Sequence, residues 1–73
     1  MSTIKKIVHY HIARLRDRQP EVRLAAIREL QEIGDPEALE PLQVIFETDE
    51  DLDIRRAAQV AGRSVFLKSR AQK

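Results

Sequence analysis

The sequence predicts an all-α protein made of two stacked antiparallel helical hairpins, four helices in total. Three observations lead to this fold class. Apolar residues recur every three or four positions in four separate segments. Proline and glycine stand between these segments, at Pro20, Gly34 and Pro36. The second half of the chain also partly repeats the first at a shift of 32 residues, and a period of this size is typical of stacked helical hairpins.

The first hairpin is expected to begin with Ser2 or Thr3 as a helix cap, and its first helix to end near residues 16–18. Pro20 suits the first position of the second helix, where its missing N–H costs nothing. Gly34 is expected to stop that helix. The helical apolar positions of this hairpin are Ile4, Ile7, Val8, Ile12 and Leu15, then Val22, Ala25, Ala26, Leu30 and Ile33.

The second hairpin is expected to start with Asp35 as a cap and Pro36 in the first turn. Pro41 lies inside the apolar pattern, so it should either kink the third helix or delay its regular part to near Glu40. The fourth helix is expected to begin at residues 53–54. The apolar positions here are Leu39, Leu42, Ile45 and Phe46, then Ile54, Ala57, Ala58, Ala61 and Val65.

The internal repeat is clearest around the second and fourth helices. It fails at Leu15, which meets Glu47, and this predicts that the first helix of one unit is shifted by one residue. It fails again at Leu30, which meets Gly62, so the second hairpin lacks one core leucine. The matching pairs include Asp17 with Asp49, Val22 with Ile54, Arg23 with Arg55, and Ile33 with Val65.

Charge is segregated along the chain although the net charge is only +1. Residues 34–53 carry eight acids and no base, whereas residues 54–73 carry six bases and no acid. This order predicts that the acidic third quarter lies near a basic element in the fold, and that the C-terminal end is basic. The acidic run 48–53 has neither the central glycine nor the final glutamate of a calcium loop, so we interpret it as a helix-capping turn.

The repeated segment resembles a HEAT-like repeat, most closely the short type named for the phycobilisome lyases. Residues 17–46 match closely and residues 49–58 match a second time. The resemblance implies a short HEAT-like alpha-solenoid that forms one domain over residues 1–73. Its hairpins would span about 2–34 and 35–70. The matching residues are Asp17, Val22, Arg23, Ala25, Ala26, Leu30, Ile33, Gly34, Asp35, Pro36, Leu39 and Leu42.

The resemblance also implies a structural role for an aspartate–arginine ladder along the stack. It pairs Asp17 with Arg23, and Asp49 with Arg55. An arginine in the first turn of a helix can bond the carbonyls and carboxylates of the preceding turn bidentately.

Two hairpins are fewer than the three or so that such stacks normally need to be stable alone. We therefore expect one end of the stack to dock on a protein partner or on a second copy, as a possible homodimer. Under the alternative, Phe66 folds back into the gap at Gly62 and the monomer is complete. The apolar residues that two hairpins would not readily cover are Leu24, Ile27, Val60, Phe66 and Leu67.

The sequence predicts no catalytic residue, no cofactor and no metal site. His9 and His11 are two residues apart on a helix, so they point in different directions and cannot hold one metal ion. The chain has no cysteine for a disulfide or a thiolate site. Its two glycines are isolated, so no glycine-rich phosphate loop is predicted.

The resulting interpretation is a non-catalytic interaction module, an adaptor or small regulatory subunit. The second helix of each hairpin would supply its binding face, which such stacks make concave. No segment is apolar enough to be a membrane span or a signal peptide, which gives a cytoplasmic protein by default. The predicted partner-binding residues are Arg28, Gln31, Arg56, Gln59, Arg63, Phe66 and Leu67.

Two alternatives stay open. The family resemblance implies a phycobilisome-related factor, a bilin lyase-like protein or a phycobilisome turnover factor, that would bind phycobiliproteins or bilin. A second alternative is weak nucleic-acid binding by the basic C-terminal helix, although eight acids next to this patch argue against it. The basic residues in question are Arg55, Arg56, Arg63, Lys68, Arg70 and Lys73.

Overall fold

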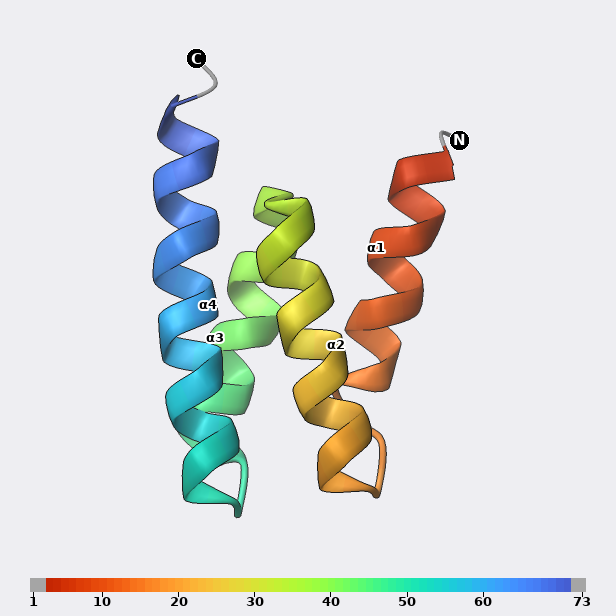
Figure 1. Cartoon of the computed structure of the whole chain (residues 1–73), viewed down its shortest axis with the longest axis vertical. Helices are drawn as coiled ribbons and strands as arrows, with labels where there is room; N and C mark the ends of the chain where they lie inside the picture. Colours follow the sequence, from red (N-terminus) through yellow and green to blue (C-terminus); the bar gives the residue numbers. More distant parts are fainter. Residues whose placement is uncertain (1–2, 72–73) are drawn as a thin grey trace.

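The computed structural model describes residues 3–71 and shows four α-helices, with no strand among these residues. Successive helices run in opposite directions, so that they form two antiparallel hairpins that lie side by side (Figure 1). This confirms the predicted all-α fold of two stacked hairpins. The helices are α1 (Thr3–Arg14), α2 (Pro20–Ile33), α3 (Leu39–Thr48) and α4 (Leu52–Ala71), with a short 3-10 helix, η1 (Pro36–Ala38), before α3.

The link between the two hairpins forms as predicted. Gly34 has a φ of 75°, in the left-handed region, and its N–H donates to the carbonyl of Leu30 at 3.0 Å. The carboxylate of Asp35 then accepts the N–H of Glu37 at 2.8 Å and caps η1. A Cβ on residue 34 would lie 2.9 Å from Cδ of Lys68, so any other residue here would also displace this side chain of α4.

Pro41 lies in the first turn of α3. The chain first makes the 3-10 turn η1, and the regular helix begins at Leu39, one residue before the predicted start near Glu40. Pro41 is therefore the third residue of α3, where the N–H has no intrahelical partner in any α-helix. The Ser2 alternative for the first helix cap lies outside the described residues.

The connections within the two hairpins differ in length. They span residues 15–19 in the first hairpin and 49–51 in the second. The first helix is therefore displaced by two residues under the 32-residue shift, and the predicted displacement of one residue was wrong. Helix α1 also ends at Arg14, before the predicted 16–18, because the next amides bond to carbonyls three residues back and tighten the chain into a turn.

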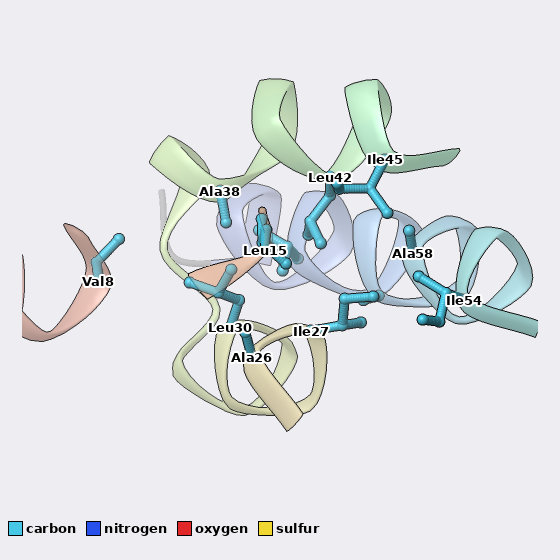
Figure 2. Packing of buried hydrophobic residues seen from close by; sticks show 12 residues of the cluster. Val8, Leu15, Ala26, Ile27, Leu30, Ala38, Leu42, Ile45, Ile54 and Ala58 are labelled. Atoms are coloured by element: carbon cyan, nitrogen blue, oxygen red, sulfur yellow. The ribbon is translucent and has the colours of Figure 1, made fainter. Parts of the chain in front are cut away.

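One hydrophobic core fills the space between the hairpins (Figure 2). Ile27 of α2 is buried and points toward Ile54 and Ala58 of α4, whereas the sequence placed it beside the buried stripe. Ala25, which the sequence placed on the buried stripe of the same helix, is exposed. The buried core residues are Val8, Leu15, Ala26, Ile27, Leu30, Ala38, Leu42, Ile45, Ile54, Ala58, Ala61 and Val65.

Candidate protein-interaction site

Arg23 joins the two hairpins close to their intra-hairpin connections, residues 15–19 and 49–51. Its Nε lies 2.8 Å from Oδ2 of Asp49 and its Nη2 lies 3.1 Å from Oδ1, which makes a bidentate pair. The side chains of Arg23 and Asp49 are only 10% and 4% exposed. Nη1 of Arg23 also donates to the carbonyls of Asp17 and Arg18 at 2.9 and 3.0 Å. The predicted pairing of side chains within each hairpin was therefore wrong, because the ion pair crosses between hairpins.

The other two members of the predicted ladder lie at opposite ends of the stack. Oδ1 of Asp17 accepts the N–H of Gln19 at 2.9 Å, and Nε of Arg55 donates to the carbonyl of Phe46 at 2.8 Å. Within residues 3–71, neither the Asp17 carboxylate nor the Arg55 guanidinium has an ion-pair partner. Each therefore keeps its charge available at one end of the molecule.

The acidic run between α3 and α4 builds a turn, as predicted. Oδ1 of Asp49 accepts the N–H of Asp51 at 2.9 Å, and Oδ1 of Asp51 accepts the N–H of Asp53 at the same distance. Oδ1 of Asp51 also accepts the N–H of Ile54 at 3.3 Å, so Asp51 satisfies two amides in the first turn of α4, whose positive end favours carboxylates. In the part of the chain that the structure describes, no three His, Cys, Asp or Glu side chains are grouped to hold a metal ion.

Helix α1 meets the acidic start of the second hairpin through a small charged cluster. Nζ of Lys5 lies 2.8 Å from Oδ2 of Asp35 and 3.7 Å from Oε1 of Glu37. Nε2 of His9 lies 2.7 Å from Oε2 of Glu37. This is the approach of a basic and an acidic element that the charge order predicted.

The cluster shifts two pKa values. The hydrogen bond with Asp35 raises the pKa of Lys5 above its usual value. Partial burial opposes ionisation of Asp35, but the hydrogen bonds from Lys5 and from the N–H of Glu37 outweigh burial and lower the pKa of Asp35. The folded state therefore favours the ionised form of Asp35.

The lowered pKa of Asp35 predicts that protonation of this carboxylate at low pH reduces the free energy of unfolding. A carboxyl with a lowered folded-state pKa contributes stability above its unfolded pKa, near 4, and this contribution is lost as the pH falls through the folded-state pKa. We expect Asp35→Asn to flatten the dependence of the free energy of unfolding on pH below about 5. Urea unfolding between pH 2.5 and 7 measures this. Glu40→Gln, which changes an exposed carboxyl on α3, is the control, and an equal flattening in both variants would contradict the assignment.

Exposed and half-buried residues of α4 form two stripes. The first consists of Arg56, Val60, Arg63 and Leu67, at spacings of four, three and four residues, which places them on one face of the helix. The second stripe has the same spacing, starts one residue earlier and lies about 100° around the helix. It consists of Arg55, Gln59, Gly62 and Phe66. The partner-binding residues predicted on the fourth helix therefore do not form one surface.

Phe66 does not fill the gap at Gly62. A Cβ on residue 62 would meet no atom within 4 Å, and the Phe66 side chain is 48% exposed. The guanidinium of Arg70 lies 5.6 Å from the centre of the Phe66 ring, a cation–π distance. The alternative in which Phe66 folds back and completes the monomer is therefore wrong.

The predicted residues of α2 lie on the side of that helix that α4 approaches. Arg28 is exposed and Gln31 is half-buried, three residues further along the helix. Nζ of Lys68 donates to the carbonyls of Gln31 and Glu32 at 2.9 and 3.4 Å, which joins α4 to the C-terminal end of α2. Leu67 directly precedes Lys68 and is 53% exposed.

The comparisons with known proteins agree with this architecture. The family model for HEAT repeats matches residues 5–62. The chain belongs to the HEAT-repeat family. HEAT repeats generally mediate protein–protein interaction, and the match is to HEAT repeats in general, without selecting the phycobilisome-lyase type. Neither the search of curated proteins nor the search of solved structures found a match.

The two HEAT hairpins leave a groove between α1 and α3 that the sequence did not predict. It has a volume of about 580 Å³, and Ile12, Pro41 and Val44 are among its apolar lining residues. His9 lies at the groove and contacts Glu37, whereas the ring of His11 packs edge-on against Tyr10 at 5.1 Å. The two histidines thus have different neighbours, as their spacing predicted.

The sequence placed Val60 among the apolar residues that two hairpins would not readily cover, but not among the partner-binding residues. Its side chain is 59% exposed, between the predicted residues Arg56 and Arg63. The four-three-four spacing on the fourth helix would have revealed it, had the predicted residues been sorted by face. Within residues 3–71, no helix is both long enough and apolar enough to span a bilayer.

Proposed function

We propose that this HEAT-repeat chain is a non-catalytic interaction module, an adaptor or small regulatory subunit, that binds a segment of a partner protein. The general role of HEAT repeats in protein–protein interaction supports this class of function. The binding surface in this proposal is the α2–α4 face, which we define as Arg28, Arg56, Val60, Arg63 and Leu67.

The observation that carries the proposal is the stripe of apolar and basic side chains along α4. Val60 and Leu67 are 59% and 53% exposed, and they are spaced by two helical turns. Large apolar side chains that are grouped on a surface are characteristic of interaction sites, because contact with a partner removes them from water. They provide the apolar centre of the proposed site.

The charges on the α2–α4 face define the chemistry of the partner segment. Arg56 and Arg63 flank Val60, and neither has an ion-pair partner among residues 3–71. Helix α4 has no acidic residue after Asp53, whereas α2 carries Glu32 beside its own arginine, so positive charge is concentrated on α4. Arginine binds carboxylates in a planar, bidentate geometry. The partner segment should therefore combine apolar anchors with acidic residues.

A titration with two model peptides tests this proposal. One helical peptide carries leucines on one face and glutamates beside them, and the other has lysines in place of the glutamates. We expect the acidic peptide to bind and the basic peptide not to bind, as measured by fluorescence anisotropy. The double variant Arg56→Glu/Arg63→Glu should bind the acidic peptide at least about tenfold more weakly, because it replaces two attractive contacts with repulsive ones.

The matched control is Arg16→Glu/Arg18→Glu, which makes the same change in net charge at exposed positions outside the α2–α4 face. It should retain most of the affinity of the unmodified protein. Equal losses in both double variants would mean that net charge alone drives binding, and would contradict the proposed face. Tight binding of a 20-base-pair DNA duplex with a steep salt dependence, and none of the acidic peptide, would support the nucleic-acid alternative instead.

A further inference from the structure

Helix α2 carries a stripe of residues that the second hairpin covers. The stripe consists of Arg23, Ile27, Leu30 and Gly34, all of them buried. Its first member binds Asp49, and its last member packs against Lys68 of α4. This stripe is the seam along which one hairpin receives the next.

Helix α4 carries a stripe at the same repeat positions, 32 residues later, and it is uncovered. It is the second stripe described above, in which Gln59 and Phe66 are exposed and Arg55 and Gly62 are half-buried. Arg55 repeats the arginine that forms the inter-hairpin pair, and its own bond within residues 3–71 is from Nε to the Phe46 carbonyl. Position 62 faces open space, and the Phe66 ring is half exposed. Helix α4 therefore presents the same kind of stripe that the second hairpin covers on α2, and no hairpin of the described residues covers it.

The first hairpin, at the opposite end of the stack from α4, carries the groups that would bind such a stripe. Asp17 holds the repeat position of Asp49, and its carboxylate accepts only the N–H of Gln19 among the described residues. Pro36 holds the repeat position of Lys68 and is exposed. The first hairpin thus offers an acidic group and an apolar ring at the positions that the second hairpin uses on α2.

We propose that a second copy of this chain stacks its first hairpin on the exposed α4 stripe, so that the Asp17 carboxylate of the second copy binds Arg55 as Asp49 binds Arg23. The same repetition places Pro36 of the second copy at Phe66. Two observations select a second copy as the occupant. The unpaired charges at the two ends are complementary, and the new contact continues the seam that already joins the two hairpins. This surface is distinct from the α2–α4 face, so the inference does not depend on the proposed function.

The composition of the stripe sets the strength of this contact. Ile27 and Leu30 fill the internal seam, whereas Gln59 and Gly62 stand at these positions on α4. The end-to-end seam thus buries less apolar surface than the internal one and is weak and reversible. The contact is also head-to-tail, so each added copy exposes a new free end and the assembly is a short chain of variable length.

Light scattering across a dilution series measures this directly. We expect the average mass of the unmodified protein to rise above the 8.4 kDa of the monomer as the concentration approaches about 1 mM, and to pass the dimer mass at the highest concentrations. Added salt should reduce the association, since the Arg55–Asp17 contact is partly exposed to solvent. A constant monomer mass over the whole range would overturn the proposal.

Two variants block the two ends separately. Asp17→Asn removes the charge at one end and keeps an oxygen that can accept the Gln19 N–H. Phe66→Asp blocks the other end at an exposed position and leaves every internal hydrogen bond in place. Each variant alone should remain monomeric where the unmodified protein associates. An equimolar mixture should stop at a 1:1 dimer, because each variant retains the end that the other lacks.

The mixture distinguishes this arrangement from a symmetric dimer. In a symmetric contact through α4, Asp17→Asn alone would associate like the unmodified protein, and this outcome would overturn the head-to-tail arrangement. Mass that stays at the monomer value in the mixture, with both variants folded by circular dichroism, would also overturn it. Arg55→Gln provides a second block of the α4 end and should behave like Phe66→Asp in the same mixture.

Discussion

Replacing Asp49 with alanine is expected to lower the free energy of unfolding by about 3–5 kcal/mol. The carboxylate is 4% exposed and holds both the Nε and the Nη2 groups of Arg23, so the substitution leaves a buried guanidinium without its counter-charge. A chain of this length has a total stability of roughly 4–11 kcal/mol, so the loss is about a quarter of the stability or more. Thermal melts followed by circular dichroism should show a decrease in the melting temperature of at least about 10 °C.

Glu50→Ala is the matched control, because it removes the same charge one residue along the chain from an exposed side chain. It should change the free energy of unfolding by less than about 0.5 kcal/mol. Equal melting temperatures for Asp49→Ala and Glu50→Ala would mean that the Arg23–Asp49 pair does not hold the hairpins together. Because Arg23 also binds the carbonyls of Asp17 and Arg18, Arg23→Ala should be at least as destabilising as Asp49→Ala.

Replacing Leu30 with alanine is expected to lower the free energy of unfolding by about 2–5 kcal/mol. The side chain is fully buried in the core between the hairpins, so truncation removes apolar contacts and leaves a cavity. Urea unfolding followed at 222 nm should show a lower midpoint with an unchanged slope.

Gly62→Ala tests the same repeat position in the second hairpin. Unlike Leu30→Ala, it should raise the free energy of unfolding. A Cβ there meets no atom within 4 Å, and alanine favours the helical backbone over glycine by about 0.5–1 kcal/mol. We therefore expect a small rise in stability. A loss of stability at Gly62, or no effect at Leu30, would mean that the two repeat positions do not differ in burial as the structure shows.

Most of the fold could be predicted from the sequence because its signals are local. Gly34, Asp35 and Pro36 mark the link between hairpins through backbone preferences that operate within a few residues. The buried face of α2 was harder to predict. The sequence placed Ala25 on the buried stripe and Ile27 beside it, and only the direction from which α4 approaches determines that Ile27 is buried and Ala25 is exposed.

The candidate site depends on long-range placement, which the sequence does not specify. Asp17 and Asp49 are equivalent by repeat, so composition alone could not decide which of them binds Arg23. The structure decides this because the Asp49 carboxylate is brought to the guanidinium from 26 residues away. The predicted partner-binding residues were assembled by helix and by polarity, whereas the four-three-four spacing along the fourth helix divides them between two stripes.

The groove between α1 and α3 has a consequence for how the molecule moves. Helix α1 packs on α2 and η1 without a close neighbour on its α3 side, and Val8 is its one buried residue. The other three α-helices each contribute two or more buried residues to the core. Local opening is least costly where few apolar contacts must be broken. We therefore expect the amide protons of α1 to exchange with solvent through local openings of this helix that leave α2, α3 and α4 folded.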